Sequence, residues 1–263
     1  MGERKKYHRG RRKKKKGGII STLILIIAIA VFCVSGYQLY KIFGGYHQGK
    51  SEYDKVREVA VHGDDKDEDE FVVDFDELKK INADTVGWIR FYPEPSQISY
   101  PLVQTTDNDL YLNRTFSANE NTVGAIFVNC DNASDFSDRN TIIYGHRMMD
   151  HSMFHDLEKY KDESFWKENP YFYIYTPDGR KLSCHIYSAG IVKDTSSTYL
   201  TQFASDEEYQ AFLDDTKRAG AYHTGVEVTT DQRVVTLSTC TAASDDNRMV
   251  VRGVIESEDV VKK

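Results

Sequence analysis

The sequence predicts a mainly-β domain, an antiparallel barrel or sandwich, preceded by one transmembrane helix. Three features predict it: a long uncharged apolar run near the N-terminus, many short β-rich runs separated by turn residues, and only two amphipathic helices between those runs. With 263 residues, of which 40% are hydrophobic and 12% aromatic, the chain can bury one substantial core. A wholly disordered or fibrous protein is thereby excluded.

Residues 1–16 form a basic arm that holds ten of the 34 Lys and Arg residues and one of the 41 acidic residues. The remaining residues, 17–263, carry 24 basic and 40 acidic groups, a net charge of -16. A body this acidic repels a phosphate backbone, so the composition argues against nucleic acid as a partner.

Residues 17–40 contain no formally charged side chain and are rich in Ile, Leu, Ala and Val. As an α-helix rising about 1.5 Å per residue, this run is about 36 Å long, enough to cross a hydrocarbon core of about 30 Å. The positive-inside rule places the arm in the cytoplasm and the rest of the chain outside the cell. A cleaved signal peptide fits less well, because Ala28-Ile29-Ala30 lies inside the apolar run. We therefore expect a single-pass protein of the cell membrane that contacts the lipid bilayer through residues 17–40.

Residues 41–70 mix Gly, Lys and acidic residues and end in an acidic run, so we expect an extracellular linker with a possible short helix over Ser51–Val61. The folded domain is predicted over residues 71–263. It begins with a helix over residues 72–82, where apolar residues recur at helical spacing.

Short β-rich runs follow that helix. They are Thr85–Phe91, Tyr100–Gln104, Gly124–Asn129, Asn140–Tyr144, Tyr171–Thr176, Lys181–Val192, Val226–Thr229, Arg233–Cys240 and Met249–Glu256. The clearest hairpin is at Pro177-Asp178-Gly179. One helix is predicted between His151 and Lys167, and a second from a capping box at Ser205 to Gly220.

The four cysteines are Cys33, Cys130, Cys184 and Cys240. Cys33 lies in the apolar run, which leaves three in the exported part and no C-x-x-C pair, so neither a disulfide framework nor a structural zinc site is indicated. Cys130 and Cys184 are predicted to be small buried apolar residues.

Three groups suited to thiol catalysis stand at predicted strand ends. Cys240 ends its strand, where a thiol is better exposed than inside a strand. Arg248 begins the strand that returns after the turn, so antiparallel pairing brings its guanidinium near the thiol. His146 follows the end of another strand and Gly145, which gives the backbone freedom there. A thiol with an ordinary pKa of about 8.5 needs such a cation and proton carrier to act as a nucleophile at neutral pH.

These residues resemble the sortase signature: Leu237-Ser238-Thr239-Cys240, with Arg248 after it and Tyr144-Gly145-His146 before it. Further motifs resemble class B sortases, namely Gly87-Trp88-Ile89, Tyr100-Pro101-Leu102-Val103-Gln104, Asp107-Asn108 before Tyr111-Leu112, Arg147-Met148 before Met153-Phe154, and the helix Ser205–Gly220. The similarity extends from about Asp74 to Ile255. It implies a closed eight-stranded sortase-type β-barrel with N-terminal helices and a helix between its sixth and seventh strands, anchored by a single pass on a Gram-positive cell.

The resemblance also implies a cysteine transpeptidase that cleaves a C-terminal sorting signal after Thr. Cys240 would form a thioester with the Thr carbonyl, His146 would protonate the departing amine, and Arg248 would hold the substrate backbone and the developing oxyanion. The partners would be secreted proteins with a sorting signal and a stem-peptide or cross-bridge amine of peptidoglycan. No cofactor and no metal ion is expected.

Six substrate-binding residues are implied by the same resemblance: Asn108, Leu112, Thr195, Tyr199, Leu200 and Ser238. Leu112, Tyr199 and Leu200 fit ordinary core positions nearly as well. The turn from Cys240 to Arg248 is compact, whereas some class B members have a longer one, which leaves the recognised motif open.

Other interpretations remain. A Cys–His cell-wall hydrolase would pass the acyl group to water, and a membrane-tethered binding module would use Cys240 only structurally. His151 and His155 are four residues apart, but the sequence between them lacks the Glu of a zincin helix and a third ligand, so we expect surface histidines. Asp138 and Asp150 are both candidates for orienting His146.

Overall fold

The computed structural model describes residues 17–63, 70–242, 244 and 246–261, so the predicted basic arm lies outside the described residues. The chain forms two compact units, which divide between Gly44 and Gly45. α1 (Gly17–Ala60) runs through this division and includes one stretch that is long and apolar enough to cross a membrane, by length and composition alone.

The last turns of α1 belong to the second unit and pack on it. Their apolar side chains that face the domain are buried: Tyr53, Val56 and Ala60. The Tyr53 hydroxyl donates to the Gly124 carbonyl (2.8 Å) and accepts from the Phe116 N–H (3.1 Å). The predicted linker over residues 41–70 is thus helical to Ala60, which confirms the helix expected over Ser51–Val61 except at its last residue and extends it toward the N-terminus. A few well-placed apolar residues anchor this mostly polar segment, and residues 64–69 of the predicted acidic run lie outside the described residues.

A small two-stranded ribbon pairs β1 (Val61–His62) with β2 (Val72–Val73). α2 (Phe75–Ile81) follows, and the Asp74 side chain caps it by accepting from the Glu77 N–H at 2.9 Å. The helix predicted over residues 72–82 therefore starts later, because Val72 and Val73 are used in the ribbon.

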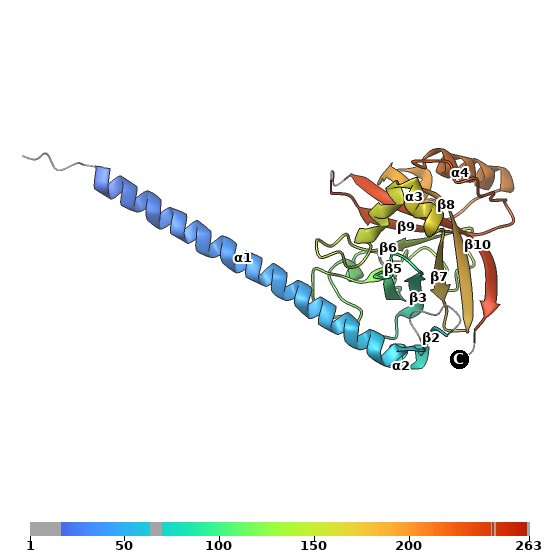
Figure 1. Ribbon diagram of the computed structural model, residues 1–263, viewed down its shortest axis with the longest axis horizontal. Coiled ribbons are helices and arrows are strands. Elements are labelled where there is room, and N and C mark those ends of the chain that lie inside the picture. Colours follow the sequence, from blue (N-terminus) through green and yellow to red (C-terminus); the bar gives the residue numbers. More distant parts are fainter. Residues whose placement is uncertain (1–16, 64–69, 243, 245, 262–263) are drawn as a thin grey trace, which may run out of the picture. The chain divides into compact units, whose positions relative to one another are not determined.

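Eight strands close into a barrel (Figure 1). They are β3 (Thr85–Phe91), β4 (Ser99–Val103), β5 (Ile126–Val128), β6 (Asn140–Tyr144), β7 (Tyr171–Tyr175), β8 (Arg180–Lys193), β9 (Val234–Cys240) and β10 (Asn247–Val260). Around the barrel the order is β10-β8-β7-β3-β4-β5-β6-β9, which confirms the closed eight-stranded barrel. The barrel is not wholly antiparallel, since β4 pairs with β5 and β6 pairs with β9 in parallel. Parallel neighbours cannot be joined by a tight turn. The segment from β4 to β5 is a long loop, and the segment from β6 to β9 contains two other strands with helices before and after them.

The run Val226–Thr229 was predicted as a strand and is not one. Val228 is buried in a second apolar cluster with Tyr187 and Phe212, so its alternating pattern reflects packing without a strand ladder. The same cluster holds α4 (Asp206–Arg218) against β8, β9 and β10 (Figure 1).

The predicted helices are partly confirmed. α4 begins at Ser205, whose hydroxyl accepts from the Glu208 N–H at 3.3 Å, and it lies between β8 and β9, the sixth and seventh barrel strands. The helix predicted between His151 and Lys167 is instead the 3₁₀ helix η2 (His155–Lys161) followed by α3 (Glu163–Glu168). Asp162 separates them, because its carboxylate accepts from the Ser164 N–H and starts a new helix. Two further 3₁₀ turns are η1 (Leu110–Leu112) and η3 (Ser197–Tyr199).

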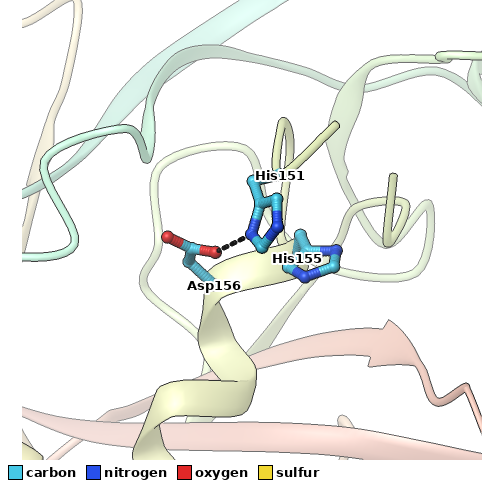
Figure 2. A group of neighbouring side chains, drawn as sticks. All are labelled: His151, His155 and Asp156. Atoms are coloured by element: carbon cyan, nitrogen blue, oxygen red, sulfur yellow. Dashed lines mark hydrogen bonds and ion pairs between the residues drawn. The ribbon is translucent and has the colours of Figure 1, made fainter. Parts of the chain in front are cut away.

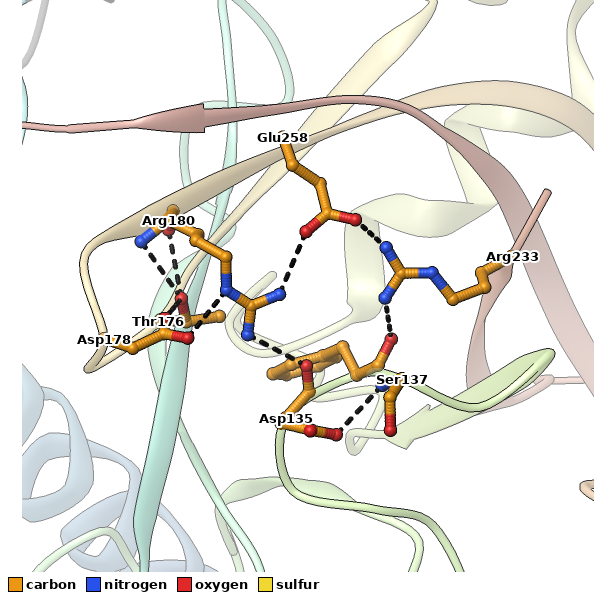
Figure 3. A network of polar contacts seen from close by, with 8 residues as sticks. Asp135, Ser137, Thr176, Asp178, Arg180, Arg233 and Glu258 are labelled. Carbon is orange, nitrogen blue, oxygen red and sulfur yellow. Dashed lines mark hydrogen bonds and ion pairs between the residues drawn. The ribbon is translucent and has the colours of Figure 1, made fainter.

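A network of charged side chains ties three segments together where β10 ends (Figure 3). The Glu258 carboxylate lies between Arg180 of β8 and Arg233, which precedes β9. Arg180 also donates to the Asp135 carbonyl at 3.1 Å, and Arg233 to the Phe136 carbonyl at 2.7 Å. These contacts fix the end of β10 remote from Arg248.

Candidate active site

Cys240 and Arg248 face one another across two paired strands. Cys240 is the last residue of β9 and is exposed, and its Cα partner in the antiparallel ladder is Arg248 of β10. The predicted pairing of these two residues is therefore confirmed.

His146 reaches the same barrel edge through the parallel pairing of β6 with β9. Tyr144 pairs with Ser238, and the Gly145 N–H donates to the Ser238 carbonyl at 3.2 Å, so His146 follows directly beside the end of β9. Parallel strands end at the same edge, and this places the imidazole next to the Cys240 strand end. Gly145 matters for a reason different from the one predicted: a Cβ there would lie 2.7 Å from the Phe154 ring.

The His146 ring is held by main chain. Its Nε2 donates to the Leu112 carbonyl at 2.6 Å; because a carbonyl only accepts, Nε2 carries the proton and Nδ1 is the nitrogen left for proton exchange. Gly124 makes room for the ring, since its φ is +66° and a Cβ would lie 2.7 Å from His146 Cδ2. Sequence analysis did not single out Gly124, although a glycine at the head of a predicted strand is a signal of close approach.

Neither acid considered for orienting His146 does so. The Asp138 carboxylate accepts from the Asn132 side-chain amide and the Ala133 N–H, and Asp150 accepts from Ser152. Both carboxylates stabilise their own loops, so the question that the sequence left open is answered by neither of them.

One pocket, of about 230 Å³, joins these groups. Its lining residues come from η1, the ends of β5, β6, β9 and β10, and the segments between them: Asn108, Leu112, Phe127, Tyr144, Gly145, His146, Ser238, Thr239, Cys240 and Arg248. The thiol, the imidazole and the guanidinium therefore border a single cavity.

The Arg248 guanidinium lies beside a carboxylate that sequence analysis missed. Its terminal nitrogens approach the Asp194 carboxylate at 3.8 Å and donate to the Asn247 carbonyl at 3.2 Å. The Arg248 side chain is 25% exposed, so the pair is partly screened and its role is mainly to orient the guanidinium. Asp194 follows β8 immediately, and no pattern in the sequence pairs it with Arg248.

The structure brings some of the expected substrate-binding residues to this pocket. Asn108, Leu112 and Ser238 line it. Tyr199 lies behind it: its hydroxyl is 2.9 Å from the Ser238 hydroxyl, and its ring stacks on Tyr144. Thr195 and Leu200 are exposed and do not line this pocket.

The two phenols at and behind the pocket wall are neutral. Burial raises the pKa of Tyr144 to about 12 and also raises the pKa of Tyr199, so neither phenol ionises near neutral pH. Asn108 uses its side-chain oxygen to accept from the Cys130 N–H at 2.9 Å, which leaves its amide N–H groups for other acceptors. The wall therefore offers hydrogen bonds suited to a peptide backbone.

The other described cysteines of the domain are in different environments. Cys184 is fully buried, as predicted, and burial raises the pKa of its thiol. Cys130 is only half-buried, which differs from the prediction, and desolvation together with the Asp131 charge raises its pKa. Among the described residues, one group could hold a metal ion, formed by His151, His155 and Asp156, and these residues do not line the pocket.

Comparison with known proteins gives consistent matches. The sortase domain family model matches residues 94–256. Sortase B of Staphylococcus aureus is 31% identical over 231 residues, covering 88% of this chain and 93% of that protein. Sortase B of Listeria monocytogenes is 31% identical over 242 residues, covering 88% of this chain and 94% of that protein. A solved S. aureus sortase B–substrate complex is 35% identical with a TM-score of 0.65, over 72% of this chain and 85% of that one.

Proposed function

This chain belongs to the sortase family, among its class B members, and we propose that it is a membrane-anchored transpeptidase that joins secreted proteins to peptidoglycan. The observation that carries the proposal is the single pocket bordered by Cys240, His146 and Arg248. The apolar stretch of α1 supports the membrane anchor. In this proposal residues 17–40 cross the bilayer, the N-terminus is cytoplasmic, and the barrel faces the cell wall.

The first half-reaction forms an acyl-enzyme. The Cys240 thiolate attacks the carbonyl carbon of a Thr in the sorting signal, and the tetrahedral oxyanion is stabilised by the Arg248 guanidinium. The C–N bond then breaks, and His146 gives its proton to the departing amine. The products are a thioester on Cys240 and the released C-terminal fragment of the signal.

The second half-reaction transfers the acyl group. A stem-peptide or cross-bridge amine loses a proton to His146 and attacks the thioester carbon, and the C–S bond breaks to restore the thiolate. Because the Nε2 proton is bound to the Leu112 carbonyl, Nδ1 is the atom assigned to both proton transfers. Arg248 stays charged throughout and therefore acts by electrostatics, not as the acid.

The substrate backbone is assigned to the pocket wall. Asn108 and Ser238 line the cavity, and the Tyr199 hydroxyl lies 2.9 Å from that of Ser238. Thr195 and Leu200 lie outside the pocket and are exposed, so we assign them to contacts with residues of the sorting signal that are farther from the cleaved bond.

The test is a peptide-cleavage assay with the full chain in detergent micelles. N-P-x-T-x peptides and S-P-x-T-G or P-P-x-T-G peptides are compared, each with and without a short amine acceptor. We expect cleavage after Thr with at least one class, faster product formation with the amine, and no cleavage by Cys240→Ala. A rate unaffected by the amine would favour the Cys–His hydrolase, and unchanged cleavage by Cys240→Ala would contradict both enzyme readings.

A further inference from the structure

Two histidines and one aspartate come together on the loop that follows the catalytic edge. Figure 2 shows the His151 and His155 rings side by side, with the Asp156 carboxylate next to His151. One ligand atom from each of the three residues lies within 4.8 Å of the others. Sequence analysis lacked a third ligand for the histidine pair, and the structure supplies it from the residue directly after His155.

Contacts with neighbouring groups fix the orientation of these side chains. The His155 Nδ1 donates to the Met148 carbonyl, which leaves Nε2 as its free ligand atom. Binding through one ring nitrogen while the other donates to a carbonyl is the usual arrangement of a metal-bound histidine. The Asp156 carboxylate is only 4% exposed; one oxygen lies 2.9 Å from Lys159 Nζ and the other 3.2 Å from His151 Nδ1.

The backbone at His151 is held in an uncommon conformation. Its φ is +65°, in the left-handed region that few residues other than glycine adopt, although His, Asn and Asp do so more often than the rest. The His151 N–H donates to the Met148 carbonyl at 3.2 Å, the same carbonyl that orients His155. This tight turn places the two imidazole rings with centroids 4.1 Å apart.

We propose that His151, His155 and Asp156 form a binding site for one divalent transition-metal ion, with Zn²⁺ as the reference ion. Two imidazoles and a carboxylate suit Zn²⁺, Co²⁺ or Ni²⁺ and do not suit Ca²⁺ or Mg²⁺, which prefer oxygen ligands. Adjacent ligands of a tetrahedral Zn²⁺ lie about 3.3 Å apart, given bonds of about 2.0–2.1 Å. The His151–Asp156 separation of 3.2 Å already matches this spacing.

The remaining adjustment is small and falls on a movable group. The three ligand atoms lie within 4.8 Å of one another, so no separation has to shorten by more than about 1.5 Å to reach tetrahedral spacing. The His151 side chain is 65% exposed and can turn toward His155, with water completing the coordination. The positive charge of Lys159 repels a metal ion bound nearby. The Lys159 ammonium lies at the Asp156 oxygen that does not face His151, and its side chain is 41% exposed, so solvent screens this repulsion.

None of the three proposed ligands takes part in the proposed transpeptidation. They lie on the segment that follows His146. The Phe154 N–H donates to the His146 carbonyl at 2.9 Å, and Arg147 bridges to Met153. A bound ion would therefore stabilise the loop between His146 and His155.

The test is Co²⁺ and Zn²⁺ titration of the full chain in detergent micelles, without a polyhistidine tag and in a Cys240→Ala background. That background removes the thiol that could hold an ion in the catalytic pocket. We expect one ion per chain, the visible d–d absorption of tetrahedral Co²⁺, and a rise in Tm with Zn²⁺. His151→Asn and His155→Asn should each weaken Zn²⁺ binding by at least about tenfold.

Two features keep the test decisive. Asn tolerates a positive φ, so His151→Asn removes the imidazole without imposing a new backbone strain, and its metal-free Tm shows that it is folded. His223→Asn is the matched control, because His223 is an exposed loop histidine outside the cluster. The proposal is overturned when no ion binds, or when His151→Asn and His155→Asn retain the affinity of the His223→Asn control.

Discussion

Replacing Gly124 by Ala tests how the protein positions its imidazole. A Cβ at this position would lie 2.7 Å from His146 Cδ2 and 2.9 Å from the Leu112 carbonyl oxygen, the two groups whose hydrogen bond orients the ring. Carbon atoms in contact settle at about 3.5–4.0 Å, so His146 must move by at least about 0.8 Å. We therefore expect the Nε2–carbonyl bond to be lost in Gly124→Ala.

The expected effects on activity and on stability differ in size. A displacement of about 1 Å at a catalytic group lowers kcat/KM by about 10²-fold. The φ of +66° adds about 1 kcal/mol of strain for Ala, which lowers Tm by about 2–4 °C in a domain of this size.

Gly225→Ala separates these two effects. Gly225 also has a positive φ, +76°, but nothing lies within 4 Å of its Cβ position. Gly225→Ala should lose only the stability that the positive φ costs, whereas Gly124→Ala should lose more in a thermal melt, because its Cβ also meets the Leu112 carbonyl oxygen at 2.9 Å. At a temperature where both variants are folded, only Gly124→Ala should lose peptide-cleavage activity. Equal kcat/KM values for the two variants would refute the inference that Gly124 makes room for His146.

Two further substitutions test neighbouring contacts. Asp194→Ala removes the carboxylate 3.8 Å from Arg248, and because the pair is partly exposed we expect kcat/KM for peptide cleavage to fall by only about 2–5-fold; an unchanged value would show that Asp194 does not orient the guanidinium. Thr198→Val removes an acceptor, 2.7 Å away, from the fully buried Arg252 guanidinium, and should lower the free energy of unfolding by about 1–3 kcal/mol in a denaturant melt. Thr195→Val, at an exposed site nearby, should leave that free energy unchanged, and equal stability of the two variants would contradict the role given to Thr198.

The barrel was largely predictable because its strands are short, β-rich and separated by strong turn residues. The hairpin at Pro177-Asp178-Gly179 shows this: Gly179 takes a φ of +89°, and its N–H donates to the Thr176 carbonyl at 3.0 Å. Val226–Thr229 is also short and β-rich, but no other strand pairs with it. A local sequence pattern does not show whether a segment has a pairing partner, so this strand was wrongly predicted. The parallel pairing of β6 with β9 was not predicted for the same reason.

The meeting of Cys240, His146 and Arg248 at one edge of the barrel was predictable, because all three stand at or next to strand ends. The groups that orient them were not. His146 is oriented by the Leu112 carbonyl, and every residue type has a main-chain carbonyl, so the sequence does not show which one accepts this hydrogen bond. Asp194 and Asp156 gain their roles only from folding, which brings them to Arg248 and to the histidine pair.

Intact-protein mass spectrometry of the full chain with a sorting-signal peptide tests the catalytic role of Cys240 most directly. We predict an adduct with the mass of the peptide's N-terminal fragment, located on Cys240 by digestion and lost when an amine acceptor is added. A cleaved peptide without any adduct, or an adduct located on Cys130 and retained by Cys240→Ala, would contradict this role.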